Sequence, residues 1–314
     1  MKILITGGLG FVGGRLSKKL STENEVIVSS RKQPEEKELK LHGGVQWVEH
    51  RALFSKAQFP SDIDTVIHLA ALNEWDSVKF PSEAIRVNID ETRQILENSI
   101  HAGVKQFIYF STAHVYGSPL AGNITEENIP VPQHPYSITH KTAEDYVIAA
   151  TLQKKIKGIV VRLSNAFGAP VSPRVNRWTL LANDLCRQAV EKNRMVLTSN
   201  GCQYRDFVCL IDVENIISQM IGEPGKMKYE IYNLGSGKSM RVFDMAQLIA
   251  SSGKDIIGKK IPIELPEGSM TSKEPELFFS IARLESEQFK IQNPVAEEIE
   301  GLLKFCARNF IQHA

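Results

Sequence analysis

The pattern of apolar positions alternates between strand-like and helix-like along the first half of the chain. Short apolar runs, many of them β-branched, predict strands at residues 2–6, 25–29, 45–48, 65–69, 106–110 and 158–162. Helix-spaced apolar positions follow the first strand and recur at about 83–102 and 137–154. This alternation predicts an α/β fold, a doubly wound parallel sheet with right-handed crossovers.

A glycine-rich turn follows the first predicted strand directly. The segment reads Thr6-Gly-Gly-Leu-Gly-Phe-Val-Gly13 and runs into a helix. Gly7 permits the tight turn, Gly10 lets a pyrophosphate approach the backbone, and Gly13 lets the helix lie close to the strand. The turn therefore predicts a Rossmann-type dinucleotide site. The cofactor contacts expected here are Gly7, Gly10, Phe11, Val12 and Gly13.

The pattern becomes less regular after residue 165. The interrupting residues are Pro170, Pro173, Asn183, Asn193 and Gly201. Further elements are expected as short strands near 207–211 and 229–233, and as helices near 241–252 and 295–312. We expect a dinucleotide-binding domain at 1–165, with later returns near 206–220. Residues 166–314 should form a smaller, partly interwoven C-terminal region that binds mainly the substrate.

Composition narrows the class of protein. The chain has 314 residues, with 37 Lys and Arg against 36 Asp and Glu, so we expect no general attraction to nucleic acid or to an anionic membrane. No apolar run approaches the roughly 20 residues that span a bilayer, and the first residues read as a folded strand and helix rather than a signal peptide. The four cysteines lack the spacing of a zinc site. We expect a cytoplasmic protein without a metal.

Polar side chains gather near the ends of predicted strands, where open parallel sheets bind their ligands. The segments are Ser-Thr-Ala-His-Val-Tyr-Gly (111–117), Pro-Tyr-Ser-Ile-Thr-His-Lys (135–141) and Arg-Leu-Ser-Asn-Ala-Phe-Gly (162–168). A hydroxyl and a tyrosine beside a nicotinamide suit the interconversion of a carbonyl and an alcohol. The tyrosine passes a proton to or from the substrate oxygen, and the hydroxyl orients that oxygen.

These segments resemble the extended short-chain dehydrogenase/reductase family, which includes nucleotide-sugar epimerases, dehydratases and ketoreductases. The resemblance runs from Lys2 to about residue 250. Besides the segments above, it rests on His-Leu-Ala-Ala (68–71), Asn88, Arg-Asp-Phe-Val (205–208) with Asp212-Val213, and Tyr-Asn-Leu-Gly-Ser-Gly (232–237).

By position, the resemblance implies a role for each candidate side chain. Thr112 would be the substrate-orienting hydroxyl and Tyr136 the general acid/base. Asn165 and Arg205 would contact the nucleotide diphosphate of the substrate, because the arginine fork suits a pyrophosphate. Further implied cofactor contacts are Leu69, Ala70 and Ala71.

One position departs from the family pattern. The family places a lysine four residues after its tyrosine, where it binds the nicotinamide ribose and lowers the pKa of the tyrosine. Here that position is His140, while Lys141 is turned by about 100° around the helix. His140 can donate a hydrogen bond to the ribose but is largely uncharged near pH 7. Tyr136 should therefore be a poorer base than usual and still an adequate proton donor, which favours ketone reduction, or slow turnover, over fast alcohol oxidation.

The end of the second predicted strand bears on the cofactor. NAD-specific members carry an acid there, whereas this chain reads Val28-Ser-Ser-Arg-Lys32. Ser30, Arg31 and Lys32 could receive a 2′-phosphate, and no acid would repel it. We therefore expect NADP, with NAD as the alternative.

The function expected from these residues is that of an NADP-dependent ketoreductase, which transfers hydride to or from a carbon of a nucleotide-linked sugar. The alternatives are a nucleotide-sugar epimerase with a retained NAD(P), and a non-catalytic dinucleotide-binding regulatory protein. A 4,6-dehydratase is disfavoured, because Ala113-His114 stands where dehydratases carry Asp-Glu after the threonine. The resemblance also implies a homodimer, paired through helices near 90–102 and 140–152.

Overall fold

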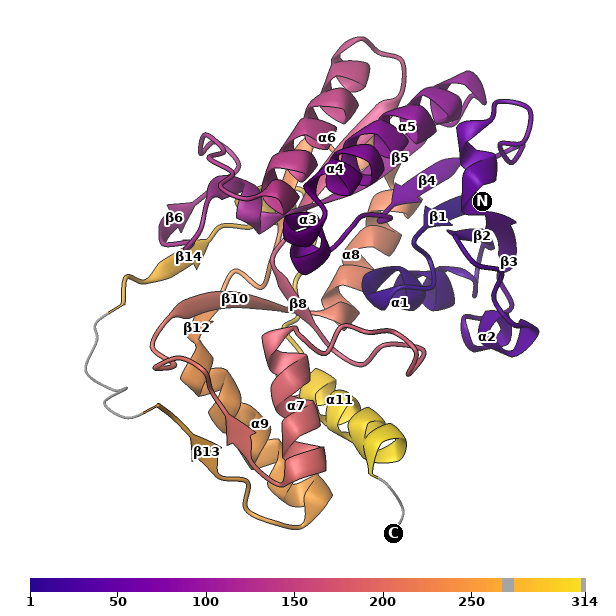
Figure 1. Ribbon diagram of the computed structural model, residues 1–314. Helices are drawn as coiled ribbons and strands as arrows, with labels where there is room; N and C mark the ends of the chain where they lie inside the picture. The colour runs from indigo at the N-terminus through magenta and orange to yellow at the C-terminus, as the bar shows by residue number, and fades with distance from the viewer. Residues whose placement is uncertain (267–273, 312–314) are drawn as a thin grey trace.

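The computed structural model describes residues 1–266 and 274–311, and its centre within those residues is a seven-stranded sheet (Figure 1). The strand order is β11-β7-β5-β4-β1-β2-β3, with parallel pairing throughout. The strands are β1 (Lys2–Thr6), β2 (Glu25–Ser30), β3 (Gln46–Glu49), β4 (Thr65–His68), β5 (Gln106–Thr112), β7 (Lys157–Leu163) and β11 (Ile231–Leu234). The order reverses between β1 and β4, as a doubly wound sheet requires. The predicted fold class is confirmed.

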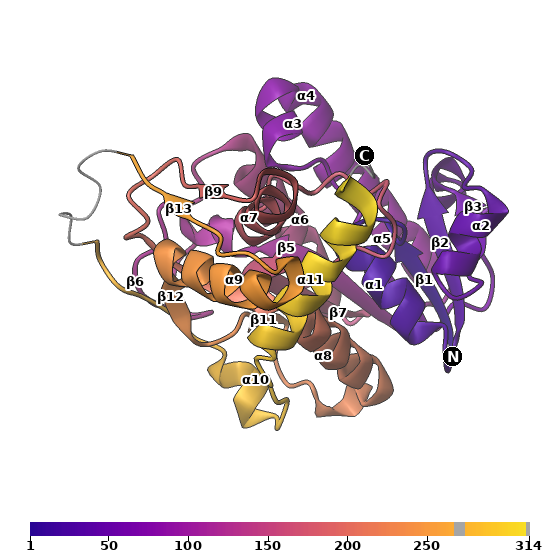
Figure 2. The same ribbon diagram turned by 90° about the horizontal axis from the view of Figure 1, so that it is seen from below.

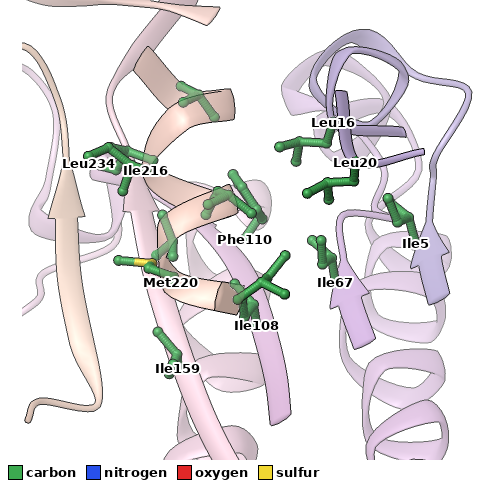
Figure 3. Close-up of a cluster of buried hydrophobic side chains, with 14 of the residues drawn as sticks. Ile5, Leu16, Leu20, Ile67, Ile108, Phe110, Ile159, Ile216, Met220 and Leu234 are labelled. Carbon is green, nitrogen blue, oxygen red and sulfur yellow. The ribbon is translucent and has the colours of Figure 1, made fainter. Parts of the chain in front are cut away.

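Helices cover both faces of this sheet. On one face lie α1 (Phe11–Leu20) and α8 (Leu210–Gly222), and on the other α5 (Thr92–His101) and α6 (Pro135–Leu152). Figure 3 shows the first face, where Leu16 and Leu20 of α1 and Ile216 and Met220 of α8 meet apolar strand residues such as Ile108. The four-residue spacing within each helix places these side chains on one stripe, which is buried against the sheet.

A smaller lobe carries its own apolar core. Its helices α7 (Leu181–Lys192), α9 (Val242–Ile257) and α11 (Val295–Phe310) pack side by side (Figure 2). Short strands form three small sheets: β8 (Asn165–Phe167), β10 (Tyr204–Cys209) and β12 (Ser239–Arg241); β9 (Met195–Val196) with β13 (Ile263–Glu264); and β6 (Gly122–Ile124) with β14 (Leu277–Phe279). The remaining helices are α2 (Glu36–Leu41), α3 (Glu74–Lys79), α4 (Pro81–Ala84) and α10 (Ala282–Ser286), with shorter or irregular turns at η1 (His50–Phe54), η2 (Ile85–Glu91), η3 (Ala113–Tyr116) and η4 (Pro224–Lys226).

The second half differs from its expected pattern at several points. The apolar run at 207–211 does not stay extended, because β10 ends at Cys209 and α8 begins at Leu210. β11, expected in the second region, is an edge strand of the central sheet. Asn183 does not interrupt a helix. It lies inside α7, where its side-chain amide donates to the Gly168 carbonyl at 2.9 Å. The helix expected at 295–312 ends at Phe310, and residue 312 lies outside the described residues.

A buried ion pair fixes α6, the helix that opens with Pro135 and Tyr136, against the sheet. Arg162 of β7 donates from Nε to Glu144 Oε1 at 3.0 Å and from Nη2 to Oε2 at 2.7 Å. Both side chains are almost fully buried. Because a two-pronged contact of this kind tolerates little rotation, it sets the depth at which α6 lies beside β5 and β7. No helix in the described part of the chain is both long and apolar enough to cross a bilayer.

Candidate active site

A cavity of about 960 Å³ collects nearly all of the candidate residues. It lies at the carboxyl ends of β1, β4 and β5, and segments of the smaller lobe line its other side. The predicted residues that line it are Gly7, Gly10, Phe11, Val12, Gly13, Ser30, Arg31, Leu69, Ala70, Ala71, Thr112, Tyr136, His140, Asn165 and Arg205. Lys32 does not line it.

The glycine turn forms a cradle that larger residues would fill. Gly7 has φ +68°, which side chains rarely adopt, and the Gly10 N–H donates to the Gly7 carbonyl at 2.9 Å. A Cβ on Gly13 would lie 2.3 Å from the Gly7 oxygen, so α1 can approach β1 this closely only with glycine there. The α1 N-terminus has no side-chain cap and no acid in its first turn. Its free N–H groups suit a pyrophosphate, so the turn fits a dinucleotide.

Tyr136 lies at the start of α6, facing Thr112 at the end of β5. The N-cap of this helix is His134, whose Nδ1 accepts from the Ser137 N–H at 3.4 Å. Burial raises the pKa of Tyr136 to about 12, and a hydrogen bond with Thr112 acts in the opposite direction. Tyr136 is therefore protonated at neutral pH. Tyr136 and Thr112 both line the cavity.

His140 lies one helical turn after Tyr136, and the two rings meet edge to face at 4.4 Å. Its Nδ1 is 2.7 Å from the buried Tyr109 hydroxyl. We assign the proton of this bond to Tyr109, because that hydroxyl has no other acceptor among the described residues. His140 then presents Nε2–H, a buried atom without a partner, on the wall of the cavity. An unpaired donor here fits a ribose hydroxyl of the dinucleotide.

The charge state of this position differs from that of a lysine. Burial first, and then the charge of Arg177, lower the pKa of His140 to about 3. His140 is therefore neutral over the physiological pH range. Lys141 does not substitute for it, since its ammonium pairs with Asp145 on the outer side of α6.

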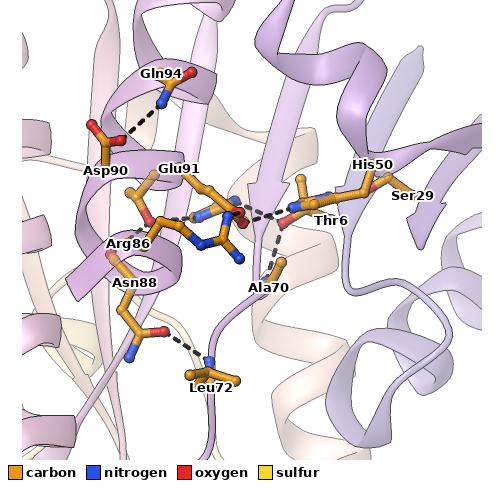
Figure 4. A network of polar contacts seen from close by, with 12 residues as sticks. Thr6, Ser29, His50, Ala70, Leu72, Arg86, Asn88, Asp90, Glu91 and Gln94 are labelled. Carbon is orange, nitrogen blue, oxygen red and sulfur yellow. Dashed lines mark hydrogen bonds and ion pairs between the residues drawn. The ribbon is translucent and has the colours of Figure 1, made fainter. Parts of the chain in front are cut away.

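The loop after β4 is held by a network of polar contacts (Figure 4). Thr6 Oγ1 accepts from the Ala70 N–H at 3.2 Å and also bonds His68 Nδ1 at 2.7 Å. Asn88 Oδ1 accepts from the Leu72 N–H at 2.7 Å. These contacts fix residues 69–72, which line the cavity. The contact with the Leu72 N–H gives Asn88, which is part of the family pattern, a structural role in holding this loop.

A second part of the network lies beside the glycine turn. His50 bonds Ser29 Oγ through Nδ1 at 3.1 Å and Glu91 Oε2 through Nε2 at 3.3 Å, and Glu91 also pairs with Arg86. Sequence reasoning did not identify Glu91 or Arg86, which line the cavity with His50. His50 lies 21 positions from Ser29 and 41 positions from Glu91, so no local sequence spacing predicts these two contacts.

The three residues expected to receive a 2′-phosphate are not equivalent. The Ser30 hydroxyl donates to the Lys32 carbonyl at 2.6 Å and accepts from Trp47 Nε1 at 2.8 Å, so both of its roles are taken. Arg31 is exposed and lines the cavity. Lys32 is exposed outside it. Arg31 is thus the one of the three whose charged group is available at the cavity.

The opposite end of the cavity carries Asn165 and Arg205. The Asn165 amide donates to the Asp206 carbonyl at 3.0 Å, and Arg205 Nη1 lies 3.4 Å from Asn165 Oδ1. Within residues 1–266 and 274–311 the Arg205 guanidinium has no other hydrogen-bond partner, so most of its donors can bind an anion. Nearby, His114 Nε2 pairs with Glu74 Oε1 at 3.0 Å, and both residues line the cavity. Sequence reasoning had noted His114 only as a replacement and had not found its partner.

No set of three or more metal-ligating side chains lies close enough to hold an ion within residues 1–266 and 274–311. The polar side chains that line the cavity carry hydroxyls, imidazoles, guanidinium groups, carboxylates and amides.

Comparison with known proteins places this arrangement in a family. The model of the NAD dependent epimerase/dehydratase family matches residues 3–235. The chain is 26% identical to an uncharacterised UDP-glucose epimerase of Bacillus subtilis over 85% of each chain. It is 27% identical to the UDP-glucose 4-epimerase of Haemophilus influenzae, over 83% of this chain and 85% of that one. The UDP-glucuronic acid 4-epimerase of Bacillus cereus in complex with NAD has the same fold, with a TM-score of 0.79, 22% identity and coverage of 98% and 97%. The chain thus belongs to the NAD dependent epimerase/dehydratase family, within the extended short-chain dehydrogenase/reductases that its motifs resemble.

Proposed function

We propose that this protein is a nucleotide-sugar epimerase that keeps its nicotinamide dinucleotide bound. The observation that carries the proposal is the convergence of Thr112, Tyr136 and the unpaired Nε2 of His140 on the cavity that the glycine turn also lines. The epimerase relatives named above support this reaction better than the ketoreductase expected from the sequence. The names of these relatives also favour a UDP-linked sugar.

A ketoreductase is the second candidate, and one observation favours it. Neutral His140 leaves Tyr136 without the adjacent cation of the family, and the pKa of Tyr136 is raised by burial to about 12. A phenol of this kind is a good proton donor and a poor base, which suits reduction of a ketone more than oxidation of an alcohol.

The chain's own residues would divide the work as follows. The bound nicotinamide supplies the hydride acceptor and donor. Tyr136 holds or passes the proton of the substrate oxygen at Oη, and Thr112 orients that oxygen. His140 Nε2–H binds a ribose hydroxyl, the α1 N-terminus binds the dinucleotide pyrophosphate, and Arg205 with Asn165 binds the diphosphate of the nucleotide sugar.

Two measurements on purified protein distinguish these functions. An epimerase should release a nicotinamide dinucleotide when it is denatured. It should also interconvert UDP-glucose and UDP-galactose without added cofactor. Protein that contains no dinucleotide and consumes NADPH with a nucleotide ketosugar would support the reductase. Dinucleotide binding without turnover of any nucleotide sugar would contradict both and favour a regulatory protein.

We also propose that NADP(H) binds several-fold more tightly than NAD(H), because Arg31 offers a free guanidinium at the cavity and no acid ends β2. Arg31→Ala should weaken NADPH binding by about 1.5–3 kcal/mol, the range of one charged hydrogen bond, and leave NADH binding nearly unchanged. Calorimetric titration of both cofactors measures this, with the exposed Lys56→Ala as a control of equal charge. Tighter binding of NAD(H) to the unchanged protein would contradict the proposal.

A homodimer is proposed through the face formed by η2, α5 and α6. Large apolar side chains are exposed there, with Ile85 57%, Ile138 45% and Tyr146 42% accessible. Exposed apolar groups clustered on one helical layer are typical of a protein interface. Light scattering should give a mass of two chains, and Ile138→Asp should shift it toward one. A mass of one chain for the unchanged protein at micromolar concentration would contradict this.

A further inference from the structure

One arginine from outside the segments that carry the family pattern lines the same cavity as Tyr136. Arg177 lies in the connection between β8 and α7, and it lines the cavity together with Tyr136 and His140. Its side chain is half-buried. Its guanidinium has neither a hydrogen-bond partner nor an ion-pair partner within the described part of the chain. The pKa of Glu74 is lowered first by its hydrogen bond with His114 and also by the charge of Arg177, so this carboxylate offsets part of the cost of partly desolvating the cation without contacting it.

The connection that carries Arg177 is anchored on both sides of it. Before it, Arg174 pairs with Glu35 at 2.7 Å and with Glu38 of α2 at 3.2 Å. After it, Trp178 is buried in the core of the smaller lobe, where its ring meets Phe310 edge to face at 4.8 Å. Anchors this close limit how far the backbone of Arg177 can move. The backbone of Arg177 is therefore held beside the cavity that this residue lines.

The other titratable groups around Tyr136 do not supply a permanent positive charge. His140 is neutral, and the ring of His134 is stacked 6.1 Å from that of Tyr136. Burial lowers the pKa of His134 as well. Tyr109 lies behind His140 with its own pKa raised by burial. Glu74 acts on Tyr136 with a negative charge, but it is paired with His114 at 3.0 Å. Arg177 is the permanently charged cation of this set.

We propose that Arg177 takes over the electrostatic part of the role of the family lysine, stabilising the tyrosinate form of Tyr136 from the connection between β8 and α7. His140 keeps the other part, the hydrogen bond toward the ribose. The charge of Arg177 lowers the pKa of Tyr136, against the burial that raises it, and disfavours protonation of His140. The two roles of one lysine are thus divided between two residues. This inference rests on the proposed function of Tyr136 as acid and base.

The test compares Arg177→Met, Arg177→Lys and the control Lys141→Met, which removes one positive charge beside His140 but on the outer side of α6. Tyrosines labelled with ¹³C at Cζ are titrated between pH 8 and 11.5 by NMR, and Tyr136 is assigned by Tyr136→Phe in each background. Arg177→Met should contain about tenfold less Tyr136 tyrosinate at a given pH, the lower end of what a neighbouring opposite charge causes. Arg177→Lys and Lys141→Met should titrate close to the unchanged protein.

Activity then separates the inference from the function it rests on. With UDP-glucose as probe, the pH profile of kcat should move to higher pH in Arg177→Met and be restored in Arg177→Lys. An unchanged Tyr136 titration in Arg177→Met would overturn the inference, and a weakened UDP-glucose affinity alongside it would mark Arg177 as a substrate contact. The proposed function would stand in that case. It would fail instead if Tyr136→Phe retained full activity.

Discussion

Tyr136→Phe is expected to lower turnover by about 10²–10⁴-fold, the range for loss of a positioned acid and base. The substitution removes one hydroxyl and keeps the ring, so the edge-to-face contact with His140 at 4.4 Å should persist. Dinucleotide affinity and thermal stability should change little. Turnover is measured as interconversion of UDP-sugars, and in the presence of NADPH as reduction of a nucleotide ketosugar.

A matched control lies on the same helix. Tyr146 of α6 is 42% exposed and does not line the cavity, so Tyr146→Phe should retain turnover. Loss of activity in Tyr136→Phe together with release of the dinucleotide would indicate a structural defect rather than a missing proton donor. Retained activity would show that Tyr136 is not the acid and base of this protein.

The features that could be predicted from the sequence are the ones encoded by neighbouring residues. The glycine turn, the β-branched strand runs and the tyrosine at a helix start each leave a local pattern, and strand ends meet at one edge of any parallel sheet. That rule is sufficient to bring Thr112 and Asn165 to one cavity, whereas Tyr136 reaches it from the start of α6, which packs beside β5 and β7. The change from strand to helix within residues 207–211 could not be predicted from the sequence. An apolar run that is buried on all sides has the same composition in a strand and in a helix.

The residues that were missed act through contacts between distant segments. Glu74 and His114 come from α3 and η3, and neither has a spacing that predicts the other. Arg177 follows two prolines in a stretch that reads as an irregular loop, so its position at the cavity depends on the anchors of its neighbours. Asn183 would ordinarily weaken a helix, and the buried Gly168 backbone that it satisfies outweighs this preference.

His140→Lys is expected to have the second large effect, and its sign follows from the charges. In the unchanged protein the pKa of His140 is about 3, so this side chain contributes no positive charge between pH 5 and 9. A lysine there would place a cation beside the Tyr136 hydroxyl. A cation favours the anionic form, so the pKa of Tyr136 should fall from about 12 by 1–3 units.

A lower pKa gives a 10- to 1000-fold larger tyrosinate fraction at neutral pH. The rate of alcohol oxidation, which needs a base, should rise at neutral pH. The pH profile of this rate should move to lower pH. The equilibrium constant of the overall reaction cannot change, so changes in the kinetic constants of the two directions must compensate each other. His140→Gln keeps a hydrogen-bond donor without the charge and should not shift the profile, and His101→Lys makes the same exchange on the exposed end of α5.

The substitution also has a structural cost that must be separated from its electrostatic effect. Without the His140 imidazole, the buried Tyr109 hydroxyl loses its partner at 2.7 Å, which should destabilise the fold by about 1–3 kcal/mol. Combining His140→Lys with Tyr109→Phe removes the unpaired hydroxyl and should recover much of the stability, measured by denaturant unfolding, while the shifted pH profile remains. A profile identical to that of the unchanged protein in both variants would show that position 140 does not set the proton affinity of Tyr136.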